Sequence, residues 1–190
     1  MKKLLMALLV LIVLAVAFIT TRPSHYHVER STMIAAPPEA VFAVINDLHQ
    51  WDKWSPWAKK DPNMSQSYDG AASGVGASYH WSGNNDVGEG QMTIIESAPP
   101  QKVAIKIDFI KPFPGTSTAS LMLQPEGNDT SVRWAMDGEN NFIGKAMCLV
   151  MNMDKMIGPD FEQGLKSLKS VSETAASAAA ATPAQTDSTR

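Results

Sequence analysis

Cysteine is nearly absent from this sequence, which has 190 residues and a single cysteine, Cys148. One cysteine excludes an intrachain disulfide and a cysteine-rich zinc site, because both need at least a second thiol. Three common catalytic signatures are missing as well: the G-x-S-x-G nucleophile elbow, the H-E-x-x-H metal helix and the G-x-x-x-x-G-K-[ST] phosphate loop. These absences exclude several enzyme classes and identify no reaction.

Positive charge is also scarce, with 16 Lys and Arg against 19 Asp and Glu. The two ends of the chain hold Lys2, Lys3, Arg22, Arg190 and Asp187, and without them 12 basic and 18 acidic side chains remain, a net charge of −6. An acidic domain is poorly suited to a polyphosphate backbone. We therefore expect no nucleic-acid partner.

The N-terminal segment, by contrast, lacks charge of either sign from Leu4 to Ile19. Sixteen helical residues span roughly 24 Å, somewhat less than the ~30 Å hydrocarbon core, and snorkelling lysines together with Thr20 and Thr21 extend that reach. Residues 1–22 are therefore predicted to be a transmembrane anchor or signal segment, with the membrane as partner through residues 4–21.

Two fates of this segment remain open. Ala15-Val16-Ala17 matches a small-residue cleavage site, which would make the segment a secretory signal cut after Ala17. The apolar run continues through Phe18 and Ile19 with no polar region before Ala17, and this context favours an uncleaved anchor.

The flanking charges predict the orientation of the anchor. Lys2, Lys3 and the amino terminus outweigh Arg22, and positive charge tends to stay in the cytoplasm. The prediction is a single-pass protein of the inner (cytoplasmic) membrane whose remaining chain lies in the periplasm or outside. At the other end, residues 174–190 consist mainly of Ala, Ser and Thr, and we expect this tail to be disordered.

The middle of the chain, residues 24–173, has the hydrophobic periods of a strand-rich domain. Residues 25–35 alternate with Tyr26, Val28 and Ile34 on one side, and Pro37-Pro38-Glu39 begins a short helix. Turn residues separate further strands that together indicate an antiparallel meander, expected at residues 64–69, 77–83, 89–98, 101–110, 116–124 and 130–137.

After Asn141 the apolar period changes to 3.6, which predicts a long C-terminal helix. Gly158-Pro159 falls inside this helix, so a kink or a break is expected there. A strand, short helices, six more strands and a terminal helix make an α+β fold, with a curved antiparallel sheet wrapped around one long helix.

This order of elements resembles the helix-grip fold, and three segments resemble the polyketide cyclase/dehydrase and lipid transport family of the START-like superfamily. The segments are YHVERSTMIAAPPEAVFAVINDLHQWDKWSPW (26–57), GVGASYHWSG with VGEGQMTIIES (74–83, 87–97) and MNMDKMIGPDFEQGLKSLK (151–169). The resemblance implies seven strands, two short helices after the first strand, and a deep pocket between sheet and helix that often takes an apolar or amphipathic small molecule. It does not imply a reaction.

Aromatic and methionine side chains are the candidate lining of such a pocket. Trp51, Trp54 and Trp57 lie three residues apart, and of these Trp57 is the candidate ligand contact while the other two are expected in the core. The strand faces add five candidates, and the start of the long helix adds two flexible thioethers: Tyr79, Trp81, Phe109, Trp134 and Met136, then Met147 and Met151. Ordinary core packing is the competing interpretation for each.

Candidates for catalysis and metal binding are few. His25 and His27 share a strand face, but no third ligand accompanies them, and His80 is expected on the solvent face. Asp154 lies near the apolar stripe of the last helix, where it is either a buried carboxylate with a raised pKa or the partner of Lys145 or Lys155, the alternative we favour. We expect neither a metal nor a cofactor.

Three functions remain for a domain of this kind. The first is a membrane-anchored START-like domain that binds a hydrophobic small molecule or lipid without transforming it. The second is a cyclase- or hydrolase-type enzyme that uses Asp154, Tyr79 or a pocket water as acid or base. The third is a non-catalytic interaction module of the cell envelope whose cavity is packed shut.

Overall fold

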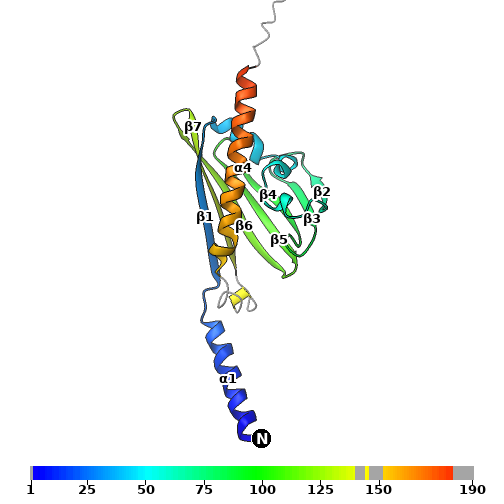
Figure 1. Cartoon of the computed structure of the whole chain (residues 1–190), viewed down its shortest axis with the longest axis vertical. Coiled ribbons are helices and arrows are strands. Elements are labelled where there is room, and N and C mark those ends of the chain that lie inside the picture. Colours follow the sequence, from blue (N-terminus) through cyan, green and yellow to red (C-terminus); the bar gives the residue numbers. More distant parts are fainter. Residues whose placement is uncertain (1, 140–143, 146–151, 182–190) are drawn as a thin grey trace, which may run out of the picture.

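The computed structural model of the chain describes residues 2–139, 144–145 and 152–181. It consists of an N-terminal helix, α1 (Lys2–Thr20), followed by a curved sheet with one long helix, α4 (Met153–Ala181), on its inner side (Figure 1). We call the sheet face toward α4 the inner face.

α1 is a helix that buries none of its side chains in the rest of the protein. Its 19 residues make it about 28 Å long at 1.5 Å per residue, close to the thickness of a hydrocarbon core. At its end the hydroxyls of Thr20 and Thr21 donate to the carbonyl oxygens of Ala17 and Phe18, at 2.7 Å each. By length and composition α1 can cross a membrane.

The sheet contains the seven strands that the sequence predicts, all paired antiparallel. Their spatial order is β1-β7-β6-β5-β4-β3-β2, so the first and last strands along the chain are neighbours at one edge. The strands are β1 (His25–Ile34), β2 (Ser65–Gly70), β3 (Ala77–Ser82), β4 (Glu89–Ala98), β5 (Lys102–Lys111), β6 (Gly115–Glu126) and β7 (Asp129–Glu139).

Alternation along each strand sorts the side chains between the two faces. On β5, Val103 and Ile105 are fully buried on the inner face, whereas Lys106 between Ile105 and Ile107 is exposed on the outer face. On β7, Val132 and Trp134 are buried and Arg133 is exposed. The period of two therefore places one dry face against α4 and one wet face toward solvent.

Three short helices connect β1 to β2: α2 (Pro38–Ile45), η1 (Leu48–Lys53) and η2 (Trp57–Lys59). α2 begins with proline and Glu39 in its first turn, as the sequence indicates. The carboxylate of Asp47 caps η1 by accepting from the backbone N–H of His49 at 2.9 Å.

α4 places its apolar stripe, Phe161, Leu165 and Leu168, on the inner face of the sheet. Pro159 lies within α4, and the helix continues through it, so of the expected kink or break the break does not occur. The residues around Ile143 and Val150, which we assigned to the same helix, lie outside the described residues.

The end of α4 lies further along the chain than the sequence indicates. We expected disorder from Thr174, but α4 continues to Ala181, and Ala176 still packs against the core. Alanine has the highest intrinsic helix propensity, so a run of alanines prolongs a helix that is already held by packing. Residues 182–190 lie outside the described residues.

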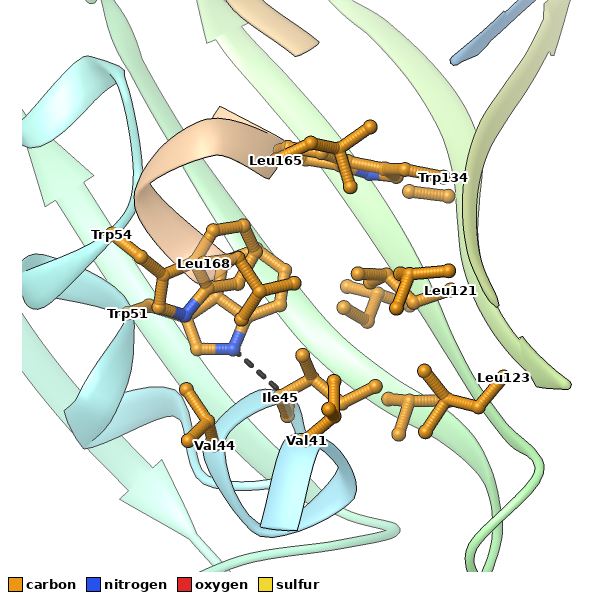
Figure 2. Close-up of a cluster of buried hydrophobic side chains, with 14 of the residues drawn as sticks. Val41, Val44, Ile45, Trp51, Trp54, Leu121, Leu123, Trp134, Leu165 and Leu168 are labelled. Atoms are coloured by element: carbon orange, nitrogen blue, oxygen red, sulfur yellow. Dashed lines mark hydrogen bonds between the residues drawn. The ribbon is translucent and has the colours of Figure 1, made fainter. Parts of the chain in front are cut away.

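Aromatic rings fill the space between the sheet and the middle of α4. The ring of Phe161 stacks face to face on Trp134 of β7, with centroids 4.1 Å apart and an interplanar angle of 7°. Trp51 and Trp54 pack beside Trp134 and Leu168 (Figure 2). The indole N–H of Trp51 donates to the carbonyl of Ile45 at 3.0 Å, which ties η1 to α2. Both tryptophans are core residues, as the sequence suggests.

The first prediction concerns the seating of α4. Phe161→Ala should lower the free energy of unfolding by about 3–5 kcal/mol, because it removes a ring that is 1% exposed and stacked on Trp134. Gln163→Ala, an exposed position on the same helix, should change it by less than about 0.5 kcal/mol. Urea unfolding of both variants measures the difference, and equal stabilities would contradict this packing.

Candidate ligand-binding site

Burial of the inner face changes along the strands. Three side chains of one row across its middle, Ile94, Ile105 and Val28, are at most 1% exposed. The two rows nearest the β5–β6 turn instead contain side chains that are only half buried. We call these two rows the open rows. Paired in register across the sheet, they consist of Tyr79, Met92, Ile107, Ser117, Gly138 and Tyr26, then Trp81, Gly90, Phe109 and Gly115.

Small residues form the floor of the open rows. A Cβ at Gly90 would lie 2.5 Å from the ring of Trp81 and 2.7 Å from the carbonyl oxygen of Asp108, so glycine alone lets the indole lie over β4. In the same way, the ring of Tyr26 lies over Gly138 of β7. Glycine inside a strand often marks such a close approach. The two glycines therefore let the rings of Trp81 and Tyr26 lie close against the sheet at either side of the open rows.

One polar pair interrupts this apolar surface. The hydroxyl of Tyr26 and the hydroxyl of Ser117 are hydrogen-bonded at 2.7 Å, and Ser117 is 4% exposed. Tyr26 reaches Ser117 across β7, since Gly138 leaves room for its ring. Two hydroxyls within an apolar surface provide both a donor and an acceptor.

A chain of aromatic rings forms one side of the open rows. Tyr68 packs on Tyr79 at 5.2 Å, Tyr79 on Trp81 at 6.1 Å, and Trp81 meets Phe109 edge-on at 6.2 Å. The indole N–H of Trp81 donates to the carbonyl of Val87 at 3.0 Å, which fixes the ring. Burial raises the pKa of Tyr79 to about 12, so this phenol is neutral at physiological pH.

α4 covers the opposite side of the inner face. It packs chiefly along β1, while β4 and β5 extend away beside it (Figure 1). At its N-terminal end Met153 and Ile157 are half buried against the core, as is Trp57 of η2, which meets both Trp134 and Phe161 edge-on. The open rows therefore lie beside α4 rather than beneath its tightly packed middle.

An arginine clamps the start of α4 to β1. Arg30 donates to both carboxylate oxygens of Asp154, at 2.7 and 3.1 Å, and through Nε to Glu162 at 2.7 Å. Its guanidinium lies against Gly158, where a Cβ would collide with it. A bidentate pair of this kind is among the stronger side-chain interactions.

This clamp corrects the expectation for Asp154. The carboxylate is half exposed, its partner is Arg30 of β1 rather than Lys145 or Lys155, and the guanidinium lowers its pKa instead of burial raising it. Asp154 is thus ionised at neutral pH. The sequence feature that could have predicted this pair is an arginine at an inner-face position of the first strand, because a charge at such a position requires a partner.

The family is settled by the match between residues 25–173 and the model of the polyketide cyclase / dehydrase and lipid transport family, which spans the whole domain from β1 into α4. The chain belongs to this family. None of the curated protein sequences matches the chain significantly.

Solved structures with the same fold come from several bacteria. Protein CV1439 from Chromobacterium violaceum is 17% identical, with a TM-score of 0.56, over 80% of this chain and 98% of that one. The protein XoxI from Bacillus cereus is 18% identical, with a TM-score of 0.55, over 76% and 93%. A protein from Nitrosospira multiformis is 19% identical, with a TM-score of 0.55, over 76% and 94%. At these identities the likeness shows the fold alone.

In this member of the polyketide cyclase / dehydrase and lipid transport family, the predicted lining residues fall into three groups. Tyr79, Trp81 and Phe109 meet in the open rows. Trp57 and Trp134 belong to the aromatic core beside α4. Met136 is 4% exposed in the row behind the open rows, while Met147 and Met151 lie outside the described residues.

Other residues of the open rows were not predicted as ligand contacts. They are Tyr26, Met92, Ile107 and Ser117, together with Gly90, Gly115 and Gly138. Gly90 carried a signal, because a glycine within the predicted strand 89–98 marks a place where a neighbouring side chain approaches the backbone, whereas Gly138 lies just past the predicted strand 130–137. The pairing of Tyr26 with Ser117 depends on the strand order, which a single sequence does not reveal.

The histidines are surface groups in this family member. Asp137 contacts His27 at 2.7 Å and raises its pKa, and His25 lies 3.7 Å from Glu139. His80 faces Asp69 of β2 at 3.1 Å on the outer face. Among residues 2–139, 144–145 and 152–181, no group of three or more potential metal ligands occurs.

The second prediction tests the floor of the open rows. Gly90→Ala should destabilise the protein by about 1–3 kcal/mol, because the new methyl group collides with the Trp81 ring and a backbone carbonyl. Gly115→Ala is the matched control, since a Cβ there meets nothing within 4 Å. Chemical denaturation compares the two. If Gly90→Ala is as stable as Gly115→Ala, Trp81 does not lie over β4 as described.

Proposed function

We propose that this chain is a membrane-anchored, extracytoplasmic START-like protein that binds a hydrophobic small molecule or lipid between the sheet and α4, with the open rows as its binding surface. The observation that supports the proposal is the gradient of burial along the inner face. Apolar side chains that stay partly exposed beside fully buried ones on the same inner face are the surface that a ligand would cover.

The chemistry of the open rows suggests an amphipathic ligand. Trp81, Phe109, Met92 and Ile107 offer a broad apolar surface, and the methionine can adapt to varied shapes. The hydroxyl pair of Tyr26 and Ser117 offers hydrogen bonds to a hydroxyl, carbonyl or carboxylate at one end of the ligand. A fatty acid or a lipid headgroup attached to acyl chains has both parts.

In the proposed function, the N-terminal helix α1 is the membrane anchor. An uncleaved α1 keeps the domain next to a source of lipids, and Lys2 and Lys3 before the span predict that the domain lies outside the cytoplasm. A binding domain that remains at a membrane can take up a poorly soluble ligand without releasing it into water.

Two other functions make different predictions. The groups that an enzyme would use are weak candidates for a general base, since Asp154 is paired with Arg30 and Tyr79 remains protonated at neutral pH. An interaction module would need no ligand, and its domain would take up no apolar molecule. The binding experiment below separates that module from a lipid-binding domain.

The third prediction concerns ligand binding. A fragment that begins at Ser24 keeps the whole core, because α1 has no buried side chain. It should bind a fluorescent fatty acid saturably, and Phe109→Ser should weaken binding about tenfold to one-hundredfold, since the lost apolar contact corresponds to about 1.5–3 kcal/mol.

The matched control is Ile95→Ser, which removes a 48% exposed apolar side chain from the outer face of β4. It should leave affinity within about twofold of the unmodified fragment, by fluorescence titration. Circular dichroism confirms that each variant is folded. Absence of saturable binding, or equal weakening by both substitutions, would contradict the proposed site and favour the interaction module.

The fourth prediction concerns topology. Alkaline phosphatase fused after Arg190 should be active, because it folds only outside the cytoplasm, and β-galactosidase fused at the same point should be inactive. The intact mass of the membrane-extracted protein should include residues 1–17. The reverse pattern of reporter activities would overturn the orientation, and loss of these residues would identify a cleaved signal.

A further inference from the structure

The β5–β6 hairpin exposes two large apolar side chains, Ile110 at the end of β5 and Phe113 in the turn, at the end of the domain from which α1 departs. Ile110 is 48% exposed and Phe113 is 53% exposed, with Pro112 and Pro114 also exposed around them. Single exposed apolar residues are common on protein surfaces, so exposure alone carries no argument. What distinguishes these two side chains from other exposed apolar residues is their position relative to α1.

The strand register fixes that position along the strands. Tyr26 of β1 pairs with Gly138, Gly138 with Ser117, and Ser117 with Ile107. His25, the first residue of β1, is therefore level with Asp108 and Thr116. The pair Phe109 and Gly115 lies one residue further toward α1, and residues 110–114 extend beyond it. At about 3.3 Å per residue the turn projects roughly 10 Å past the start of β1.

The linker between α1 and β1 is short, so the projecting β5–β6 turn stays close to the end of α1. Residues 21–24 join Thr20 to His25, whose Cα atoms are five residue steps apart and so at most about 18 Å from each other when the linker is extended. β5 is three strand spacings from β1, about 14 Å sideways. Figure 1 shows the turn at the end of the sheet that faces α1. A bilayer crossed by α1 therefore begins within reach of the turn.

We infer that the tip of the β5–β6 turn, Ile110 and Phe113, inserts into the surface of the lipid bilayer that α1 crosses, and so holds the open rows toward the membrane. This inference depends on the proposed anchoring by α1, but not on which side of the membrane the domain occupies. Phe109 of the open rows directly precedes Ile110, so a docked tip brings the ligand surface to the lipid headgroups.

The chemistry of the tip suits the interface. An aromatic ring, a β-branched aliphatic side chain and two prolines carry no charge, and Lys111 between them has a flexible stem that can keep its ammonium among headgroup phosphates. Lys111 contacts Glu89 at 2.6 Å and its side chain is 71% exposed. Two apolar side chains bind a membrane weakly by themselves, but the tether through α1 makes the second contact intramolecular, so a weak contact suffices.

The test uses the full chain reconstituted in phosphatidylcholine vesicles. In a Cys148→Ser background, an environment-sensitive fluorophore is attached at Phe113→Cys or at Val75→Cys. Val75 is the matched control, because it is 58% exposed in the turn between β2 and β3, at the end of that hairpin that points away from α1. Quenching is measured with lipids that carry a spin label at a shallow acyl position and with aqueous iodide.

The expected result is at least threefold stronger lipid-borne quenching at position 113 than at position 75, together with protection of position 113 from iodide. Equal access of iodide to both positions would overturn the inference. Protection of position 113 from both quenchers would also overturn it, because a second copy of the chain or another protein would then cover the tip.

A third label, at Leu11→Cys, separates this inference from the anchoring on which it depends. Quenching of that label by deep spin-labelled lipids shows that α1 is inserted, so absence of quenching at position 113 then refutes the tip contact alone. If position 11 is accessible to iodide, the anchor and the tip contact both fail. Fatty-acid binding by the fragment that begins at Ser24 is unaffected by either outcome.

Discussion

The stacking of Phe161 on Trp134 is the contact on which the arrangement of this domain depends. It joins the only long helix of the domain's described residues to the strand next to β1, with two rings 4.1 Å apart and nearly parallel. Leu165 and Leu168 follow on the same stripe, and Trp51, Trp54 and Trp57 surround the stacked pair. α4 is therefore fixed over the β1 side of the sheet. Because one helix cannot cover seven strands, the β3–β5 side receives less cover.

The clamp at Arg30 has a complementary effect. It holds the first turns of α4 close to β1 through Asp154 and Glu162, and Gly158 lets the helix approach the guanidinium. A helix attached at its start by charge and in its middle by aromatic packing has little freedom to shift toward β4 and β5. The open rows are then a stable feature of the fold, produced by the same contacts that stabilise it.

Most of the fold could be predicted from the sequence because its periods are local. The alternating pattern predicts all seven strands, with ends that differ by only a few residues from the observed ends. The apolar stripe at Phe161 and Leu165 predicts the long helix. The errors arose where a local rule competed with packing or propensity. Of the kink or break expected at Pro159, the break is absent, because a single missing backbone hydrogen bond is offset by the buried stripe on either side. The alanines after Thr174 extend that helix because they favour it intrinsically.

The candidate site was predicted less completely, since its residues meet only through strand pairing. Tyr79, Trp81 and Phe109 were identifiable because each is a large aromatic residue on an apolar strand face. Tyr26 and Ser117 are far apart in sequence and become partners only because β1 pairs with β7 and β7 with β6. Arg30 and Asp154 are distant for the same reason, so the sequence suggested a lysine from the same helix instead.

The strand order also connects the site to the anchor. β1 begins a few residues after α1, and antiparallel pairing then places the start of β4, the end of β5 and the start of β6 at the same end of the domain. Those strand ends are where the inner face is least buried. With a linker of residues 21–24, that end cannot move far from the membrane that α1 can cross. In the proposed function this end of the domain lies next to the membrane, so the open rows are on the part of the sheet that is nearest to lipid.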